Sequence, residues 1–158
     1  MGRWYDYKRL KEEYNLSELE VRQTIENTLL QMFTVYFEVA RLTENVEVLK
    51  STYENTKNRL IRAEYRFEYG QTNRLEVLNA KVDLVTDSIN LINARQTLRN
   101  TKRDLNVVLN QTIERNFEVD TTVSFIEELK MQTYLEEADT NNVRLQLARS
   151  NIEVSTLN

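Results

Sequence analysis

The sequence contains no proline, no cysteine and no histidine, and only two glycines among its 158 residues. A compact fold with many turns would need more of the residues that form turns. Without cysteine there is no disulfide framework, and without histidine the chain lacks the commonest metal ligand and the commonest general base at neutral pH. These absences argue against an enzyme, and we assign no catalytic, cofactor-binding or metal-binding residue.

Two further absences restrict the partners and the location. Charges of both signs are interspersed, with a net charge of −4 and no basic block, which argues against a nucleic-acid surface. No window approaches the ~20 apolar residues of a membrane-spanning helix, and residues 1–13 lack the apolar core of a signal peptide. We therefore expect either a cytosolic protein or a soluble piece excised from an exported one, and the Met1-Gly2 start favours excision.

Gly70 is the only glycine after residue 2, and helical patterns lie on both sides of it. Glycine tolerates the left-handed conformation that ends a helix and reverses the chain. The sequence therefore predicts an all-α fold based on a long antiparallel coiled-coil hairpin with unequal arms. Its first helix covers about 4–69, its tip 70–72 and its second helix about 73–111.

The first helix carries one seam that alternates steps of four and three residues, as coiled coils do. A few of its positions are polar, among them Thr56. The apolar positions are Tyr7, Tyr14, Val21, Ile25, Met32, Val35, Val39, Leu42, Val46, Leu49, Tyr53, Leu60, Ala63 and Phe67.

The second helix carries two seams that are offset by two residues, which we interpret as adjacent flanks. One consists of Leu75, Leu78, Val82, Val85, Ile89 and Ile92; the other of Val77, Ala80, Leu84, Asp87, Leu91, Ala94, Leu98, Thr101, Leu105 and Val108. A two-stranded coiled coil needs only one seam, so two seams favour a wall of helices. A broad core face in an ordinary bundle is the alternative. Asp87, within a seam, should be paired or face water.

The remainder of the chain predicts a short extended connector at 112–125 and a third helix over about 126–158. A run of Asp, Thr and Asn at 139–142 is a plausible break in that helix. Because the second arm is shorter than the first, we expect the third helix to stack above it. The whole of 1–158 would then be a single elongated helical domain.

Several motifs occur in a characteristic order. They are Tyr65-Arg-Phe-Glu-Tyr-Gly70, Leu75-Glu-Val-Leu-Asn-Ala80, Ala94-Arg-Gln-Thr-Leu98, Leu105-Asn-Val-Val-Leu-Asn110, Tyr134-Leu-Glu-Glu-Ala138 and Asn142-Val-Arg-Leu-Gln-Leu-Ala148. Together they resemble the TolC-like family of outer-membrane efflux proteins, over most of the chain. The chain departs from the family pattern in two places: Gln111-Thr112 replaces the usual Leu-Gly ending, and Val143 replaces a proline.

The resemblance implies a function in export. Members of this family are trimers whose helices form a periplasmic tunnel below a β-barrel in the outer membrane. They work with a periplasmic adaptor (a membrane fusion protein) and an inner-membrane pump. The chain would be one periplasmic hairpin without barrel strands, from a parent protein of the periplasm and outer membrane. We do not expect it to conduct alone.

The same resemblance suggests site residues. Tyr69, Gly70, Gln71 and Thr72 would form the adaptor-docking tip, although Gly70 could also be only a helix cap and turn. Arg74, Glu76 and Asn79 are candidates for the channel constriction, where carboxylates facing a narrow lumen could select cations. The alternative for Glu76 and Asn79 is an ordinary solvated helix face. Arg74 and Arg66 could pair with Glu76 or Glu68, or across a protomer boundary.

A different class of function fits the same helices. The chain could be a structural coiled-coil spacer or a protein-interaction hairpin, such as that of an adaptor. An adaptor hairpin should have matched arms between β-rich halves, and a scaffold needs only one seam per helix. The unequal arms and the second seam therefore favour the export channel.

Overall fold

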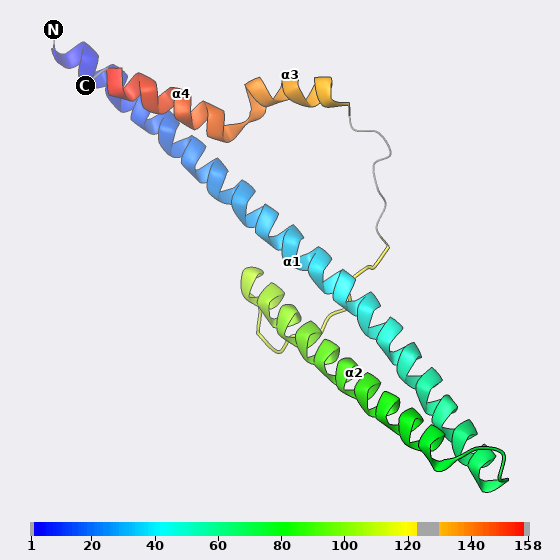
Figure 1. Ribbon diagram of the computed structural model, residues 1–158. Coiled ribbons are helices and arrows are strands. Elements are labelled where there is room, and N and C mark those ends of the chain that lie inside the picture. The colour runs from blue at the N-terminus through cyan, green and yellow to red at the C-terminus, as the bar shows by residue number, and fades with distance from the viewer. Residues whose placement is uncertain (1, 123–129, 157–158) are drawn as a thin grey trace. The chain divides into compact units, whose positions relative to one another are not determined.

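The computed structural model describes residues 2–122 and 130–156, and the regular structure in these residues is entirely α-helical (Figure 1). The helices are α1 (Gly2–Glu68), α2 (Arg74–Val108), α3 (Met131–Asn141) and α4 (Val143–Thr156). The predicted all-α fold, with a hairpin and a further helical segment, is confirmed. The expected start of the third helix, near residue 126, lies outside the described residues.

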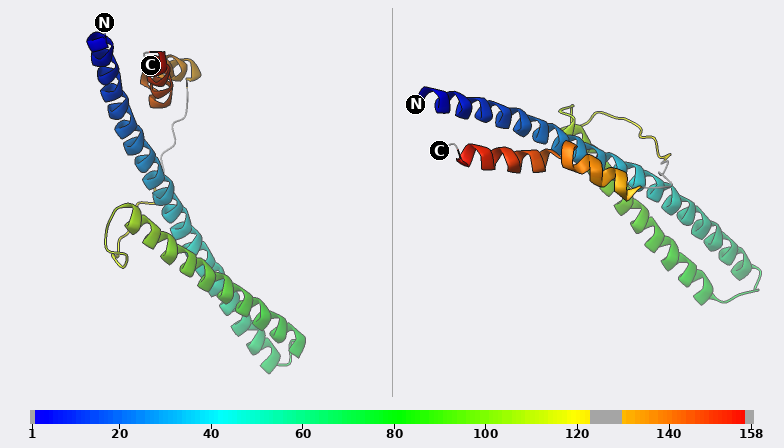
Figure 2. Two further views of the ribbon diagram at one scale, coloured as in Figure 1. Left: turned by 90° about the vertical axis from the view of Figure 1, so that its left-hand side faces the viewer. Right: turned by 90° about the horizontal axis from the view of Figure 1, so that it is seen from above.

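The chain divides into two compact units, one of Met32–Val123 and the other of Met1–Gln31 with Ser124–Asn158. The first unit contains the hairpin. Within it, α1 and α2 run antiparallel and lie next to each other, as Figure 1 and the right view of Figure 2 show. Side-chain contacts define their register: Thr56 pairs with Asp87, Arg59 with Asp83 and Arg66 with Glu76. Residue numbers rise along α1 as they fall along α2, as the predicted reversal at Gly70 requires.

Only one of the two apolar seams of α2 packs inside the hairpin. Ala80, Leu91 and Leu105 are buried, and the rest of their seam is half-buried. The other seam is exposed along its whole length. Two residues turn an α-helix by about 200°. The second seam therefore faces away from α1, nearly opposite the first, rather than on the adjacent flank that we expected.

The α1 side of this core follows the predicted seam. Val39, Leu42, Val46 and Ala63 are buried on α1. Near the tip, Ala63 on α1 lies at the level of Ala80 on α2, between the Arg59–Asp83 and Arg66–Glu76 pairs. Two alanines at one level allow the helix backbones to approach closely at this point.

Asp87 occupies a polar position within the buried seam, and it is paired, as predicted. Thr56 Oγ1 lies 2.5 Å from Asp87 Oδ2 and donates to it, while the same hydroxyl lies 3.1 Å from the carbonyl oxygen of Thr52. Burying a polar group without a partner costs free energy, whereas a satisfied pair across the interface favours the register that forms it. This pair therefore specifies the alignment of α1 and α2.

The end of α2 is closed by a left-handed residue that is not glycine. Asn110 has φ +50°, the N–H of Asn110 donates to Val107 O, and that of Gln111 donates to Asn106 O at 2.8 Å. These two bonds form a Schellman motif. From the resemblance, Gln111-Thr112 stands where the family usually has Leu-Gly. The residue with the left-handed backbone is Asn110, directly before these two.

The connector after α2 contains no strand in its described part, which ends at residue 122. The N–H of Asp120 donates to the Tyr36 hydroxyl of α1 at 3.2 Å. The Asp120 carboxylate accepts the backbone N–H of Thr122 at 2.8 Å, and this bond lowers the pKa of Asp120. The connector is thus held to the hairpin at one point and turned locally at the next.

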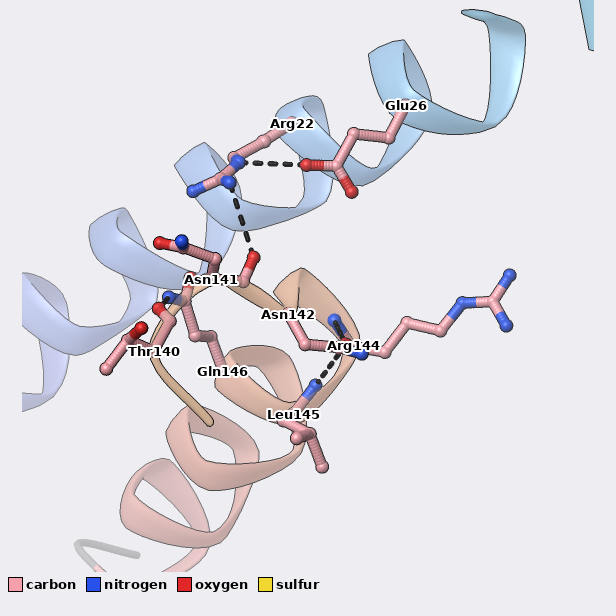
Figure 3. Close-up of polar contacts among 8 residues, drawn as sticks. All are labelled: Arg22, Glu26, Thr140, Asn141, Asn142, Arg144, Leu145 and Gln146. Carbon is pink, nitrogen blue, oxygen red and sulfur yellow. Dashed lines mark hydrogen bonds and ion pairs between the residues drawn. The ribbon is translucent and has the colours of Figure 1, made fainter. Parts of the chain in front are cut away.

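The second unit joins α3 and α4 to the first part of α1. The predicted break at 139–142 is where α3 ends and α4 begins, and Figure 3 shows its contacts. Asn142 Oδ1 accepts the N–H groups of Arg144 and Leu145 at 3.0 and 3.2 Å, which caps α4. Arg22 of α1 donates both to Glu26 and to the Asn141 carbonyl.

In this second unit, the packed flank of α1 differs from the predicted seam. On α4, Val143 and Leu147 are buried. The half-buried positions of α1 include Arg9, Glu12, Leu16, Leu19 and Gln23. The predicted seam residues Tyr7, Tyr14, Val21 and Ile25 are exposed, because they lie two residues out of phase with that flank.

We predict that Leu91→Glu destabilises the hairpin by about 3 kcal/mol or more, because Leu91 is only 5% exposed and a carboxylate there would be buried beside Asp87. Ile92→Glu is the matched control, since Ile92 is 59% exposed and the change should cost less than about 0.5 kcal/mol. Urea unfolding of both variants, at a concentration where the chain is monomeric, measures the difference. Equal losses would contradict the assignment of the buried seam.

Candidate functional site

Gly70 ends α1 and turns the chain towards α2. It has φ +69°, the left-handed conformation predicted for it. The N–H of Gly70 donates to Phe67 O at 3.0 Å and that of Gln71 to Arg66 O at 2.7 Å. This is the same Schellman motif that closes α2 at Asn110, and it satisfies carbonyls that the helix end would leave free.

The start of α2 is capped on the other side of the turn. Asn73 Oδ1 accepts the N–H of Glu76 at 3.1 Å, as an N-cap residue does. The Glu76 carboxylate in turn accepts from the Thr72 hydroxyl and from Arg66 Nη1, the latter at 2.8 Å. One carboxylate therefore joins the end of α1, the turn and the first turn of α2.

The proposed constriction residues are not in equivalent surroundings. The Glu76 carboxylate is bonded to Arg66 and Thr72 within the hairpin, and its side chain is 44% exposed. Arg74 and Asn79 are exposed. Glu76 and Asn79 line a hollow of about 400 Å³ beside the tip, together with Arg59, Ala63, Asn73, Leu75 and Ala80. The pairing of Arg66 with Glu76 was one of the alternatives that the sequence left open.

The four residues of the predicted docking tip present a small exposed surface. The Tyr69 ring is 78% exposed, Gly70 and Gln71 are also exposed, and Thr72 is half-buried. An open aromatic side chain beside a rigid turn is suited to contact with another protein, because tyrosine provides contact area at low entropic cost. Its role as a docking site stays a prediction.

A second surface extends from the tip along α2. It is the exposed seam of α2, called here the α2 ridge, and it consists of Leu75, Leu78, Val82, Val85, Ile89 and Ile92. Its side chains are between 49% and 64% exposed. A continuous row of apolar side chains over about five helical turns marks an interaction surface more often than ordinary solvent-facing surface.

Sequence reasoning missed one contact in this region. Arg59 of α1 pairs with Asp83 of α2 on the surface of the hairpin. The register could have indicated it, because folding the chain about 70–72 brings these positions opposite each other. Being exposed on both sides, this pair contributes on the order of 0–1 kcal/mol. Arg74 forms no ion pair within the described part of the chain.

The described residues contain neither a cluster of three metal-ligating side chains nor a membrane-spanning helix. In residues 2–122 and 130–156, no three His, Cys, Asp or Glu side chains are grouped so that they could hold a metal ion. No helix in the same ranges combines the length and apolar character that a membrane span requires.

Comparison with known proteins identifies a family. The sequence model described as "Outer membrane efflux protein" matches residues 1–111. This range includes α1, the tip and all of α2. Comparisons with curated proteins and with solved structures gave no match.

We predict that Gly70→Ala destabilises the hairpin by about 1–2 kcal/mol, the cost of a left-handed conformation for a residue with a Cβ atom. Steric overlap does not contribute, because a Cβ at this position has no atom within 4 Å. Gly70→Asn should cost less, since asparagine tolerates this conformation. Thermal unfolding of the two variants tests this order. An alanine variant as stable as the native chain would contradict it.

Proposed function

The chain belongs to the outer membrane efflux protein family, and on this basis we propose that it forms part of the periplasmic tunnel wall of an export channel. The channel works by enclosing a conduit of helices, with this hairpin as one segment. Its tip, Tyr69 to Thr72, docks to a periplasmic adaptor that is coupled to an inner-membrane pump. The parent protein is a homotrimer of the periplasm and outer membrane, and its activity is transport rather than catalysis.

The observation that supports this proposal best is the α2 ridge. In an isolated two-helix hairpin the outer face of α2 would be polar, because that face contacts only water. Instead α2 carries apolar residues on two nearly opposite faces, of which α1 covers one. A helix that packs on both faces is what a closed wall of helices requires. A coiled-coil spacer or a single interaction hairpin would not need the second apolar face, the α2 ridge.

The tip supports the docking part of the proposal. Its backbone is fixed by the two bonds of the Schellman motif, and Glu76 joins the turn to both helices. A surface that is already rigid loses little entropy when it binds. Tyr69 and Gln71 stand exposed on this rigid turn, where a helical adaptor tip could contact them.

We predict that Val85→Glu with Ile89→Glu abolishes assembly and efflux in the parent channel, because carboxylates would be buried where the ridge meets its neighbour. The control is Thr86→Glu with Asn90→Glu, which adds the same charge at exposed polar positions of α2. Molecular mass by light scattering and export of the channel's own substrate from cells are the two measurements. The melting temperature of the hairpin itself should not change, since both ridge residues are exposed within it. If the double ridge variant had the same molecular mass and the same export as the native channel, the proposed wall of helices would be refuted.

Docking has its own test. A photo-crosslinking amino acid at Tyr69 or Gln71 should capture the purified adaptor of the same exporter. The same amino acid at Asn116, exposed in the connector, should not. Capture at Asn116 equal to that at the tip, or no capture at the tip, would contradict docking there. The result does not depend on the ridge, so the two parts of the proposal can fail separately.

A further inference from the structure

A basic hollow lies between the end of α2 and the connector, within the hairpin unit. It has a volume of about 300 Å³. Its charged and polar lining consists of Arg99, Lys102, Arg103, Asn106, Glu114, Arg115 and Asn116, with Ile113 as the apolar member. Four cationic side chains and one carboxylate thus surround one concavity, in a chain whose net charge is −4.

The walls of the hollow are fixed by hydrogen bonds. Asn106 is 2% exposed, and its side-chain amide donates to the carbonyls of Ile113 and Arg115, both at 3.0 Å. Lys102 Nζ donates to the Phe117 carbonyl at 2.9 Å and lies 5.3 Å from the centre of the Phe117 ring. These contacts hold the connector against α2, so the cations are brought together by the fold and not by chance on a mobile surface.

The positive charge of the hollow is not neutralised within it. Glu114 pairs with Arg103 at 2.9 Å. Arg115 donates to Gln111 Oε1, which is a neutral acceptor, at 2.7 Å. Arg99 forms no ion pair in the described ranges. Asp104, a carboxylate of α2 outside the lining, also forms none there, so it neutralises no cation of the hollow. Three of the four cations therefore lack a carboxylate partner in the hollow.

The helix dipole does not account for this cluster. Cations are favoured at the C-terminus of a helix, but the effect is confined to the last turn. The last turn of α2 contains no basic residue. Three cations without a counter-charge repel one another, and a concave site concentrates their field. Such an arrangement is stabilised when an anion enters.

We propose that this hollow binds an oxyanion, a phosphate, sulfate or carboxylate group, between Arg99, Arg115 and Lys102. Guanidinium groups present two parallel N–H donors that match the geometry of these anions, and bonds between charged partners are about twice as strong as neutral ones. Glu114 opposes the anion by its charge. The site is separate from the tip and the α2 ridge, and it does not depend on the proposed transport function.

The test is a titration of the full chain with inorganic phosphate and, separately, with acetate, at ionic strength held constant by sodium chloride. The readout is the shift of the Asn106 side-chain amide and the arginine Nε–H signals in nitrogen–proton correlation spectra. We expect saturation by phosphate at a concentration where added chloride gives no shift. Saturation by acetate as well would show that a carboxylate suffices.

Three variants make the test specific. Arg99→Gln with Arg115→Gln should weaken binding by about tenfold or more, because charged hydrogen bonds are lost. Glu114→Gln should tighten it several-fold. Arg62→Gln, an exposed arginine on α1 outside the hollow, should leave it unchanged. Shifts that grow linearly without saturation, or equal affinity in the double variant and in Arg62→Gln, would overturn the proposal.

Discussion

The arrangement of this hairpin depends on one constraint: α2 has two apolar faces, and α1 packs against one of them. The buried face provides the α2 side of the core, with Leu91 and Leu105 as its largest buried members. Burying a leucine fully contributes about 1.5–3 kcal/mol, so a two-helix core of this size leaves the hairpin modestly stabilised. The α2 ridge carries six further apolar side chains, all of them exposed. Burial of that ridge against a neighbouring helix would therefore stabilise α2 further, and this links the fold to the proposed assembly.

Polar contacts provide the register that apolar seams cannot specify. A seam of similar aliphatic residues packs almost as well after a slip of one heptad, because the spacing repeats. Thr56 and Asp87 meet only in the observed alignment, within the seam, and a slip would leave a half-buried carboxylate without this partner. The pairs nearer the tip, Arg66 with Glu76 among them, are exposed and add little energy. Alignment is thus specified mainly by one contact in the interior.

The sequence predicted the features that depend on local chemistry. The reversal at Gly70 and the break at 139–142 follow from residues with clear backbone preferences, and the two seams of α2 follow from spacing. It did not predict which seam would be buried, because both are apolar and the choice depends on the partner helix.

Other features escaped prediction for a different reason. The left-handed residue after α2, Asn110, was not predicted, since asparagine enters the left-handed region less readily than glycine and gives a weaker signal. The basic hollow could not be foreseen at all. Arg99 and Arg115 come together only because Asn106 holds the connector against α2.

The turn at Gly70 also has a stereochemical meaning. Its backbone has the torsion that is natural for a residue of the opposite hand, and the space where a side chain would project is open. The position therefore disfavours the L configuration of a side chain and not its size. A D-amino acid would adopt without strain the torsion that strains an L-alanine. Among the twenty residues only glycine has no handedness to oppose this torsion.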